Sequence, residues 1–298
     1  MFKYLTLVLL LFTLALADNN AVDFLQTGLS ARSLALGNTG AAAGGHIDTV
    51  FLNPAALQEV STEFFSAAVR DFDLVENKMF ALAGAFELRG SPAVWGFIYA
   101  GAAVNGLERT GLDAEERPVE QGTFNSLKNN YTLALARRQR DGGAWYGVSL
   151  RRYLYTLDDA AAEGTGLDLG GRWHLRDIGG ASIFGGVSLR NICRTRITWS
   201  TGHEDTMPFG LNSGLSVRRN IAGGDLLGSL DWRWREEQEP AFSGGLEYAL
   251  PVLALRVGWE QRLTYGLGLR YYGLSLDYAR TLHEDLGLQQ RVSLLLYL

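Results

Sequence analysis

Hydrophobic and polar residues alternate with a period of two along most of this chain. From about residue 64 onward, segments of roughly 8 to 12 residues repeat this pattern, which is typical of strands and not of helices. One face of such a segment carries Leu253, Leu255, Val257 and Trp259, and the other carries Arg256, Gly258, Glu260 and Arg262. The pattern predicts about 14 strands, which begin near residues 64, 78, 92, 126, 144, 165, 181, 209, 226, 241, 252, 266, 274 and 290.

The connections between these segments distinguish a membrane barrel from a soluble β-sandwich. Short glycine-rich turns at 140–143, 176–180 and 219–225 alternate with longer charged stretches at 105–123, 193–208 and 235–240. Long loops at one end and short turns at the other are expected of an outer-membrane barrel. We therefore predict a transmembrane barrel of antiparallel strands with both termini on the periplasmic side. A propeller, with a turn repeat of roughly 40 residues, is the alternative.

The first 17 residues predict a signal peptide. Lys3 precedes an apolar run from Leu5 to about Leu14, and Ala15-Leu16-Ala17 supplies the small residues of a cleavage site. The run is shorter than the roughly 20 apolar residues of a spanning helix, although an N-terminal membrane anchor remains the alternative. Export to the outer membrane of a Gram-negative-type cell follows from this prediction.

Residues 18–62 lack strand periodicity and predict a plug, or hatch, in the lumen of a barrel formed by residues 63–298. Irregular backbone is tolerated at membrane depth only where protein or lumenal water satisfies it. The small residues of 41–45 permit close packing against a wall, and Pro54 fixes a turn that Asn53 can cap. A nucleotide site is the rival interpretation, but the glycines lack the G-x-G-x-x-G spacing.

The same stretch carries a family resemblance. Its matching residues are Phe24, Leu25, Gly28, Ala31, Arg32, Gly37, Asn53, Pro54, Ala55 and Leu57. They resemble the F-L-x-x-G-x-x-A-R-x-x-x-M-G and W-N-P-A-G-L patterns of the PorV/PorQ family, relatives of the FadL-type outer-membrane transporters. Leu36, Leu52 and Ala56 depart from the pattern. The resemblance implies a plugged barrel of about 14 strands, with a plug motif of Gly28, Arg32, Gly37, Gly40, Asn53, Pro54 and Ala55.

Charged residues on one face of the strands are candidates for the lumen. They are Arg151, Asp168, Arg172, Arg190, Asp231, Arg233, Glu247, Arg256, Glu260 and Asp277. We expect them to pair with one another and with the plug, which suits a plugged barrel better than an open apolar conduit. The alternative is that these ion pairs only stabilise the barrel. Trp95, Trp145 and Trp173 lie near strand ends, where they predict interfacial belts, with core packing as the alternative.

Composition excludes several classes of function. The net charge of −5 and the absence of basic runs argue against a nucleic-acid partner. The single Cys193 cannot form an internal disulfide. His203-Glu204-Asp205 is a poor metal template, and the acidic pairs lie in predicted loops. We therefore predict no catalytic residues, no metal, no cofactor and no enzyme activity.

Two functions remain open at this point. The resemblance implies an accessory or shuttle component of protein export, with exported proteins or other secretion components as partners. The alternative is a FadL-like transporter that takes a small hydrophobic ligand. In both cases outer-membrane lipid surrounds the protein.

Overall fold

The computed structural model describes residues 28–60, 63–71, 77–87, 92–140, 142–283 and 287–297. The predicted signal peptide and the first part of the predicted plug, residues 18–27, lie outside these ranges. Among the described residues, no helix has both the length and the apolar character needed to cross a membrane.

Three short helices precede a long series of strands. The helices are α2 (Ala31–Ala35), η1 (Ile47–Phe51) and η2 (Pro54–Glu59). The strands are β1 (Glu63–Asp71), β2 (Asn77–Glu87), β3 (Ala93–Leu112), β4 (Pro118–Arg138), β5 (Ala144–Leu157), β6 (Ala160–Ile178), β7 (Ala181–Arg190), β8 (Arg196–Trp199), β9 (Glu204–Thr206), β10 (Gly210–Ile221), β11 (Gly224–Arg235), β12 (Gln238–Ala249), β13 (Leu253–Glu260), β14 (Arg262–Tyr271), β15 (Leu274–His283) and β16 (Gly287–Tyr297).

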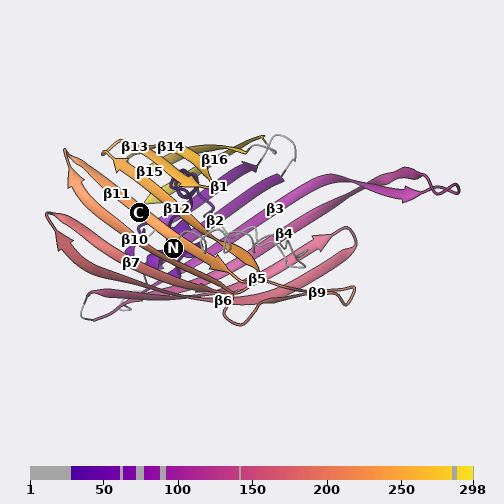
Figure 1. Cartoon of the computed structure of the whole chain (residues 1–298), viewed down its shortest axis with the longest axis horizontal. Coiled ribbons are helices and arrows are strands. Elements are labelled where there is room, and N and C mark those ends of the chain that lie inside the picture. The colour runs from indigo at the N-terminus through magenta and orange to yellow at the C-terminus, as the bar shows by residue number, and fades with distance from the viewer. Residues whose placement is uncertain are drawn as a thin grey trace, which may run out of the picture.

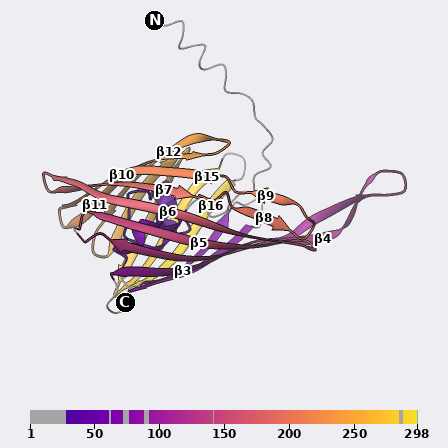
Figure 2. The ribbon, with the colours of Figure 1, turned by 90° about the horizontal axis from the view of Figure 1, so that it is seen from below.

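These strands form a closed antiparallel barrel, as the alternation predicts. All sixteen belong to one sheet, and the wall consists of the fourteen that remain when β8 and β9 are set aside. The wall closes where β1 pairs with β16, with Glu63 opposite Tyr297. The helices of residues 28–60, drawn in indigo, lie inside the ring of strands (Figures 1 and 2). We call residues 28–60 the plug.

The two faces of the wall differ in chemistry. On β13, Arg256 is buried in the lumen, whereas Leu255 and Trp259 are 53% and 51% exposed on the outer face. Large apolar side chains are exposed in the same way on most strands, including Phe97, Leu133, Leu150, Leu215, Leu230, Phe242, Leu246, Leu267, Leu276 and Leu294. An outer surface of this kind belongs in lipid. Trp145 departs from the predicted interfacial belt, because it is buried on the inner face and packs against Arg172.

The two ends of the barrel also differ, but not through loop length as predicted. One end, which we call the turn end, carries tight turns at 179–180, 222–223 and 272–273, together with the start of β1 and the end of β16. At the other, extended end, residues 105–123 are not a loop. They belong largely to β3 and β4, which contain 20 and 21 residues, about twice the 9–11 needed to span a membrane. The backbone there satisfies its hydrogen bonds by continuing the ladder, so the pair projects as a ribbon (Figure 1).

A second predicted loop, 193–208, contains the small hairpin β8–β9. After β7 ends at Arg190, an irregular stretch with positive φ at Asn191 and Arg194 leads to β8, which pairs with β6 at residues 162–164. Ile197 of β8 is fully buried against the lumenal cluster that contains Tyr153. The hairpin therefore covers part of the lumen at the extended end. The third predicted loop, 235–240, reduces to a two-residue turn between β11 and β12.

Candidate functional site

Local sequence dictates the shape of the plug. Ser30 caps α2 by accepting a hydrogen bond from the Ser33 amide at 2.9 Å, and the hydroxyls of Ser30 and Ser33 both donate to Asp48. Asn53 caps η2, with Pro54 at the first position of that helix, which is the turn that the Asn-Pro-Ala sequence predicts. Short helices joined by side-chain caps give the plug a defined fold without a long element.

Asn53 also fixes the plug to the wall. Its Nδ2 donates to the carbonyl oxygens of Ala41 at 2.6 Å and Gly171 of β6 at 3.0 Å, while its Oδ1 accepts from the Ala55 amide at 3.0 Å. The side chain is fully buried. One amide thus joins η2, the plug loop and the wall.

Replacement of Asn53 by alanine is expected to loosen the plug. Each buried partner left without its hydrogen bond costs about 1–3 kcal/mol, so η2 and the 40–44 loop should open more often. Sensitivity of expressing cells to a large antibiotic such as vancomycin measures the opening. Thr198→Ala, on the small hairpin at the extended end, is the matched control. Unchanged sensitivity with a normally assembled N53A barrel would count against this role of Asn53.

A buried ion network connects α2 with three strands. Arg32 donates to both carboxylate oxygens of Glu247 on β12, at 2.9 Å each. Glu247 also accepts from Arg256 of β13, and Arg256 donates to Asp277 of β15 at 2.6 Å. The four side chains are at most 7% exposed. Such bidentate, charge-assisted contacts are strong and geometrically specific.

The loop at residues 40–44 has no regular structure, and charged wall residues satisfy its backbone. Asp231 of β11 accepts from the amides of Gly40 and Ala41 at 2.7 and 2.8 Å. Arg172 of β6 donates to the Ala42 carbonyl at 2.6 Å, and Arg218 of β10 donates to the Gly44 carbonyl at 2.7 Å. These hydrogen bonds satisfy backbone groups that would be paired within a helix or sheet if the segment were regular.

Inward-facing glycines of the wall bring the plug backbone into direct contact with it. A Cβ atom on Gly186 of β7 would lie 1.8 Å from the carbonyl oxygen of Ala41, and one on Gly147 of β5 would lie 2.3 Å from the carbonyl carbon of Pro54. The same clash with plug atoms would occur at Gly170, Gly245, Gly258 and Gly266. The wall is therefore shaped to the plug, because at these positions no larger residue leaves room for it.

Several of the predicted lumen residues bind the plug, and two others form an ion pair with each other. Asp231 and Glu247 bind the plug directly, as does Glu260, which accepts from Asn38 and pairs with Arg233. Arg151 and Asp168 form a buried pair on β5 and β6. Asp168 also accepts from the Asn191 amide at 2.9 Å.

The remaining predicted residues take varied positions. Arg190 is buried on the wall. The Gly28 carbonyl accepts from Arg291 of β16. Gly37 has a φ of +62° and lies against the backbone of Gly244 and Trp259, a conformation that favours glycine. Gly40 packs against Leu52, and Pro54 and Ala55 are buried in η2.

Sequence reasoning missed the wall glycines, Arg218, Arg291 and Glu59. Glu59 of η2 pairs with Arg172 and, at 3.1 Å, with Arg218. The sequence held one signal for the glycines, since they alternate with the charged inward positions, as in Asp168-x-Gly170-x-Arg172. Within the described residues, no group of three or more His, Cys, Asp and Glu side chains is arranged to hold a metal ion.

One side of the lumen is lined by apolar residues instead of charged ones. A contiguous buried cluster joins Phe51 and Leu57 of the plug to Ile197 and Met207 at the small hairpin. Its wall residues are Ala81, Ala83, Ala85, Val94, Ile98, Ala100, Ala134, Ala136, Tyr153, Tyr155, Ala162 and Leu295. A packed apolar core thus extends from the small hairpin at the extended end to the plug.

A closed antiparallel barrel with an apolar outer face and a plugged lumen defines the class as a transmembrane β-barrel. No protein-family model matches the sequence, and no curated protein matches it. The fold, however, is similar to several solved structures. The toluene transporter TbuX of Ralstonia pickettii has a TM-score of 0.58 at 15% identity, with 92% of this chain and 98% of that chain covered.

Two further structures share the fold. The monoaromatic hydrocarbon channel CymD has a TM-score of 0.60 at 12% identity, over 93% of this chain and 99% of that one. A Pseudomonas aeruginosa FadL homologue has a TM-score of 0.51 at 9% identity, over 90% and 97%. At these identities the likeness establishes a FadL-type barrel fold.

Proposed function

We propose that this protein is an outer-membrane channel that passes small hydrophobic compounds, with the plug as its gate. The observation that carries the proposal is the contiguous apolar cluster between the small hairpin and Phe51 and Leu57 of the plug. An apolar solute that entered between these packed side chains would be removed from water, which favours its transfer. The fold neighbours that transport toluene or conduct monoaromatic hydrocarbons support the same class of solute.

The proposal includes the orientation of the protein. The signal peptide at residues 1–17 would direct the chain through the inner membrane, and residues 18–62 would fill the barrel. The turn end would then face the periplasm, and the β3–β4 ribbon would face the exterior, where longer extensions of such barrels usually lie. A hydrophobic solute would enter at the extended end and meet the plug before the periplasm.

Filling the apolar half of the lumen should block passage. Ala134 is buried on the inner face of β4, so Ala134→Phe is expected to lower uptake of radiolabelled toluene several-fold by occupying the route. Overpacking of this kind typically costs about 1–3 kcal/mol, which an assembled barrel should tolerate. The adjacent Leu133→Phe lies on the outer face, where Leu133 is 46% exposed, and should leave uptake unchanged.

Assembly of both variants is checked by the heat-modifiable gel shift of outer-membrane barrels. Equal uptake by the wild type, Ala134→Phe and a deletion strain would remove the channel proposal. Saturable binding of toluene by the purified wild-type barrel, weakened in Ala134→Phe alone, would support it.

Protein export is the second candidate function, and it rests on the PorV/PorQ resemblance of residues 24–57. The fold neighbours that we name favour the small-molecule channel. The two candidates differ in what deletion does. Loss of an export component would strand secreted proteins in the periplasm, and the barrel would copurify with them, whereas loss of a channel would slow uptake and leave secretion intact.

A further inference from the structure

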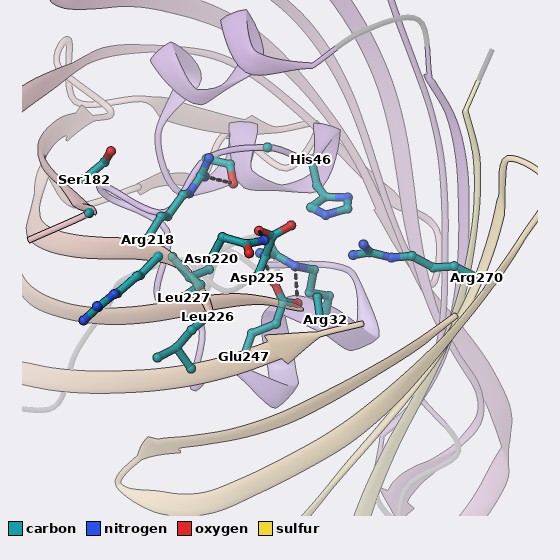
Figure 3. Close-up of a pocket in the computed structure, with 15 residues that line it drawn as sticks. Arg32, His46, Ser182, Arg218, Asn220, Asp225, Leu226, Leu227, Glu247 and Arg270 are labelled. Atoms are coloured by element: carbon teal, nitrogen blue, oxygen red, sulfur yellow. Dashed lines mark hydrogen bonds and ion pairs between the residues drawn. The ribbon is translucent and has the colours of Figure 1, made fainter. Parts of the chain in front are cut away.

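A cavity of about 470 Å³ opens between the plug and the wall at the turn end (Figure 3). Its wall residues come from the turn-end portions of β10, β11, β12 and β14 and from the β6–β7 hairpin, and its plug residues are Arg32 and the 44–46 loop. This volume lies within the range of about 300–1,000 Å³ that small-molecule sites occupy. It lies on the charged side of the lumen, apart from the apolar cluster of the proposed route.

Positive charge predominates around this cavity. The lining includes Arg32, Arg218 and Arg270, whose side chains point inward, together with Asp225 and Glu247. Glu247 is already engaged by Arg32 and by Arg256. Asp225 accepts from Asn220 at 2.9 Å. The lining therefore holds more cationic than anionic charge.

Arg270 is the residue whose charge the surroundings leave uncompensated. It points from the inner face of β14 toward His46 (Figure 3), and its Nε is buried without a hydrogen-bond partner. Within the described ranges, Arg270 forms no ion pair, unlike Arg32, Arg218 and Arg256. A buried donor without an acceptor costs free energy, which an anion would recover.

The protonation of the neighbouring His46 responds to the same excess of positive charge. Its pKa lies well below the usual value, because burial disfavours the charged imidazolium and because Arg32, Arg270 and Arg256 repel it. The ring also packs edge-on against Tyr297, whose hydroxyl lies 3.4 Å from Nδ1. His46 is therefore neutral at pH 7 and offers a polar but uncharged edge to the cavity.

We propose that this cavity is a binding site for a small organic oxyanion, whose carboxylate or phosphate group is held by Arg270 together with Arg218. Guanidinium groups match planar and tetrahedral oxyanions through paired N–H donors. Leu227 and Ala249 line the same cavity and provide contact for a short organic remainder. The anion would join β10 and β14 to the plug and so stabilise the seated plug.

The test uses the full-length barrel purified in non-ionic detergent, with calorimetric titration of inorganic phosphate at constant ionic strength. Arg270→Gln should weaken binding by about tenfold or more, since a hydrogen bond to a charged group is lost. Arg218→Gln, which leaves the Arg172–Glu59 pair in place, should weaken it several-fold. Arg152→Gln removes an equal charge from a solvent-exposed pair with Glu163 and should bind like the wild type.

A second arm identifies the source of the anion. Mixed micelles that contain phosphatidylglycerol present the same phosphate chemistry on a lipid. Binding of free phosphate that is lost in Arg270→Gln assigns the site to a soluble anion, and binding of the micelles alone assigns it to a lipid headgroup. If neither free phosphate nor the micelles bind, or if the wild type, Arg270→Gln and Arg218→Gln bind equally, the proposal is overturned.

Discussion

Gly186→Val is expected to unseat the plug while the barrel itself still forms. The added Cβ would lie 1.8 Å from the carbonyl oxygen and 2.4 Å from the carbonyl carbon of Ala41. These are backbone atoms, which cannot rotate away as a side chain can. The 40–44 loop must therefore move, and its bonds to Asp231 and Arg172 should break with it. Strand pairing of β7 is unaffected, since valine favours strands.

Channel conductance in planar bilayers measures this effect. We expect Gly186→Val to open a large conductance and to increase vancomycin sensitivity, at a stability cost of about 1–3 kcal/mol or somewhat more. Gly228→Val is the matched control, because Gly228 lies on the outer face of β11 with nothing within 4 Å of an added Cβ. If an assembled Gly186→Val barrel conducts no more than Gly228→Val, the close glycine contact does not hold the plug.

Glu247→Gln should destabilise the plug more than any other single charge removal described above. Arg32 would lose its carboxylate partner in the lumen, and Arg256 would keep only Asp277. Removing one partner of a buried ion pair typically costs about 3–5 kcal/mol, because the remaining charge stays desolvated. The free energy of unfolding of the purified barrel in urea measures the loss of stability, and hydrogen exchange of the α2 amides shows whether the plug is where it occurs.

Two further variants test whether the uncompensated charge of Arg32 causes the loss of stability. Glu163→Gln breaks the exposed pair with Arg152, and such surface pairs contribute about 0–1 kcal/mol. Arg32→Met combined with Glu247→Gln removes the uncompensated cation, so the double variant should be more stable than Glu247→Gln alone. A double variant that is less stable than the single one would show that the Arg32 cation is not the source of the loss.

Together, these contacts suggest how a gate in this barrel would work. The plug is held by a charged half of the lumen and borders an apolar half. Passage of a hydrophobic solute along the apolar half would require Phe51 and Leu57 to shift, while Arg32, Asn53 and the 40–44 loop remain anchored. Rotation of these two side chains would break none of the hydrogen bonds that hold Arg32, Asn53 and the 40–44 loop.

The sequence alone determined the barrel. Alternation with a period of two admits few other structures when apolar residues cover one complete face, and the predicted strand starts near 144, 181, 252 and 274 coincide with β5, β7, β13 and β15 within one residue. The Asn53 cap was also readable, because Asn-Pro-Ala specifies a local turn. Predictions of this kind depend only on neighbours in the chain.

Other features were decided by tertiary structure. Residues 105–123 look like a charged loop, yet they pair as strands, since strands outside lipid no longer need an apolar face. The sequence could not show which inward glycines meet the plug, nor that the buried Nε of Arg270 would lie without a hydrogen-bond partner. Those outcomes depend on how the plug, which precedes Gly186 by some 150 residues in the chain, packs against the wall. Alternation along a strand predicts whether a residue faces the lumen or the lipid, but the contacts that a lumenal residue makes with the plug depend on the packing of the whole barrel.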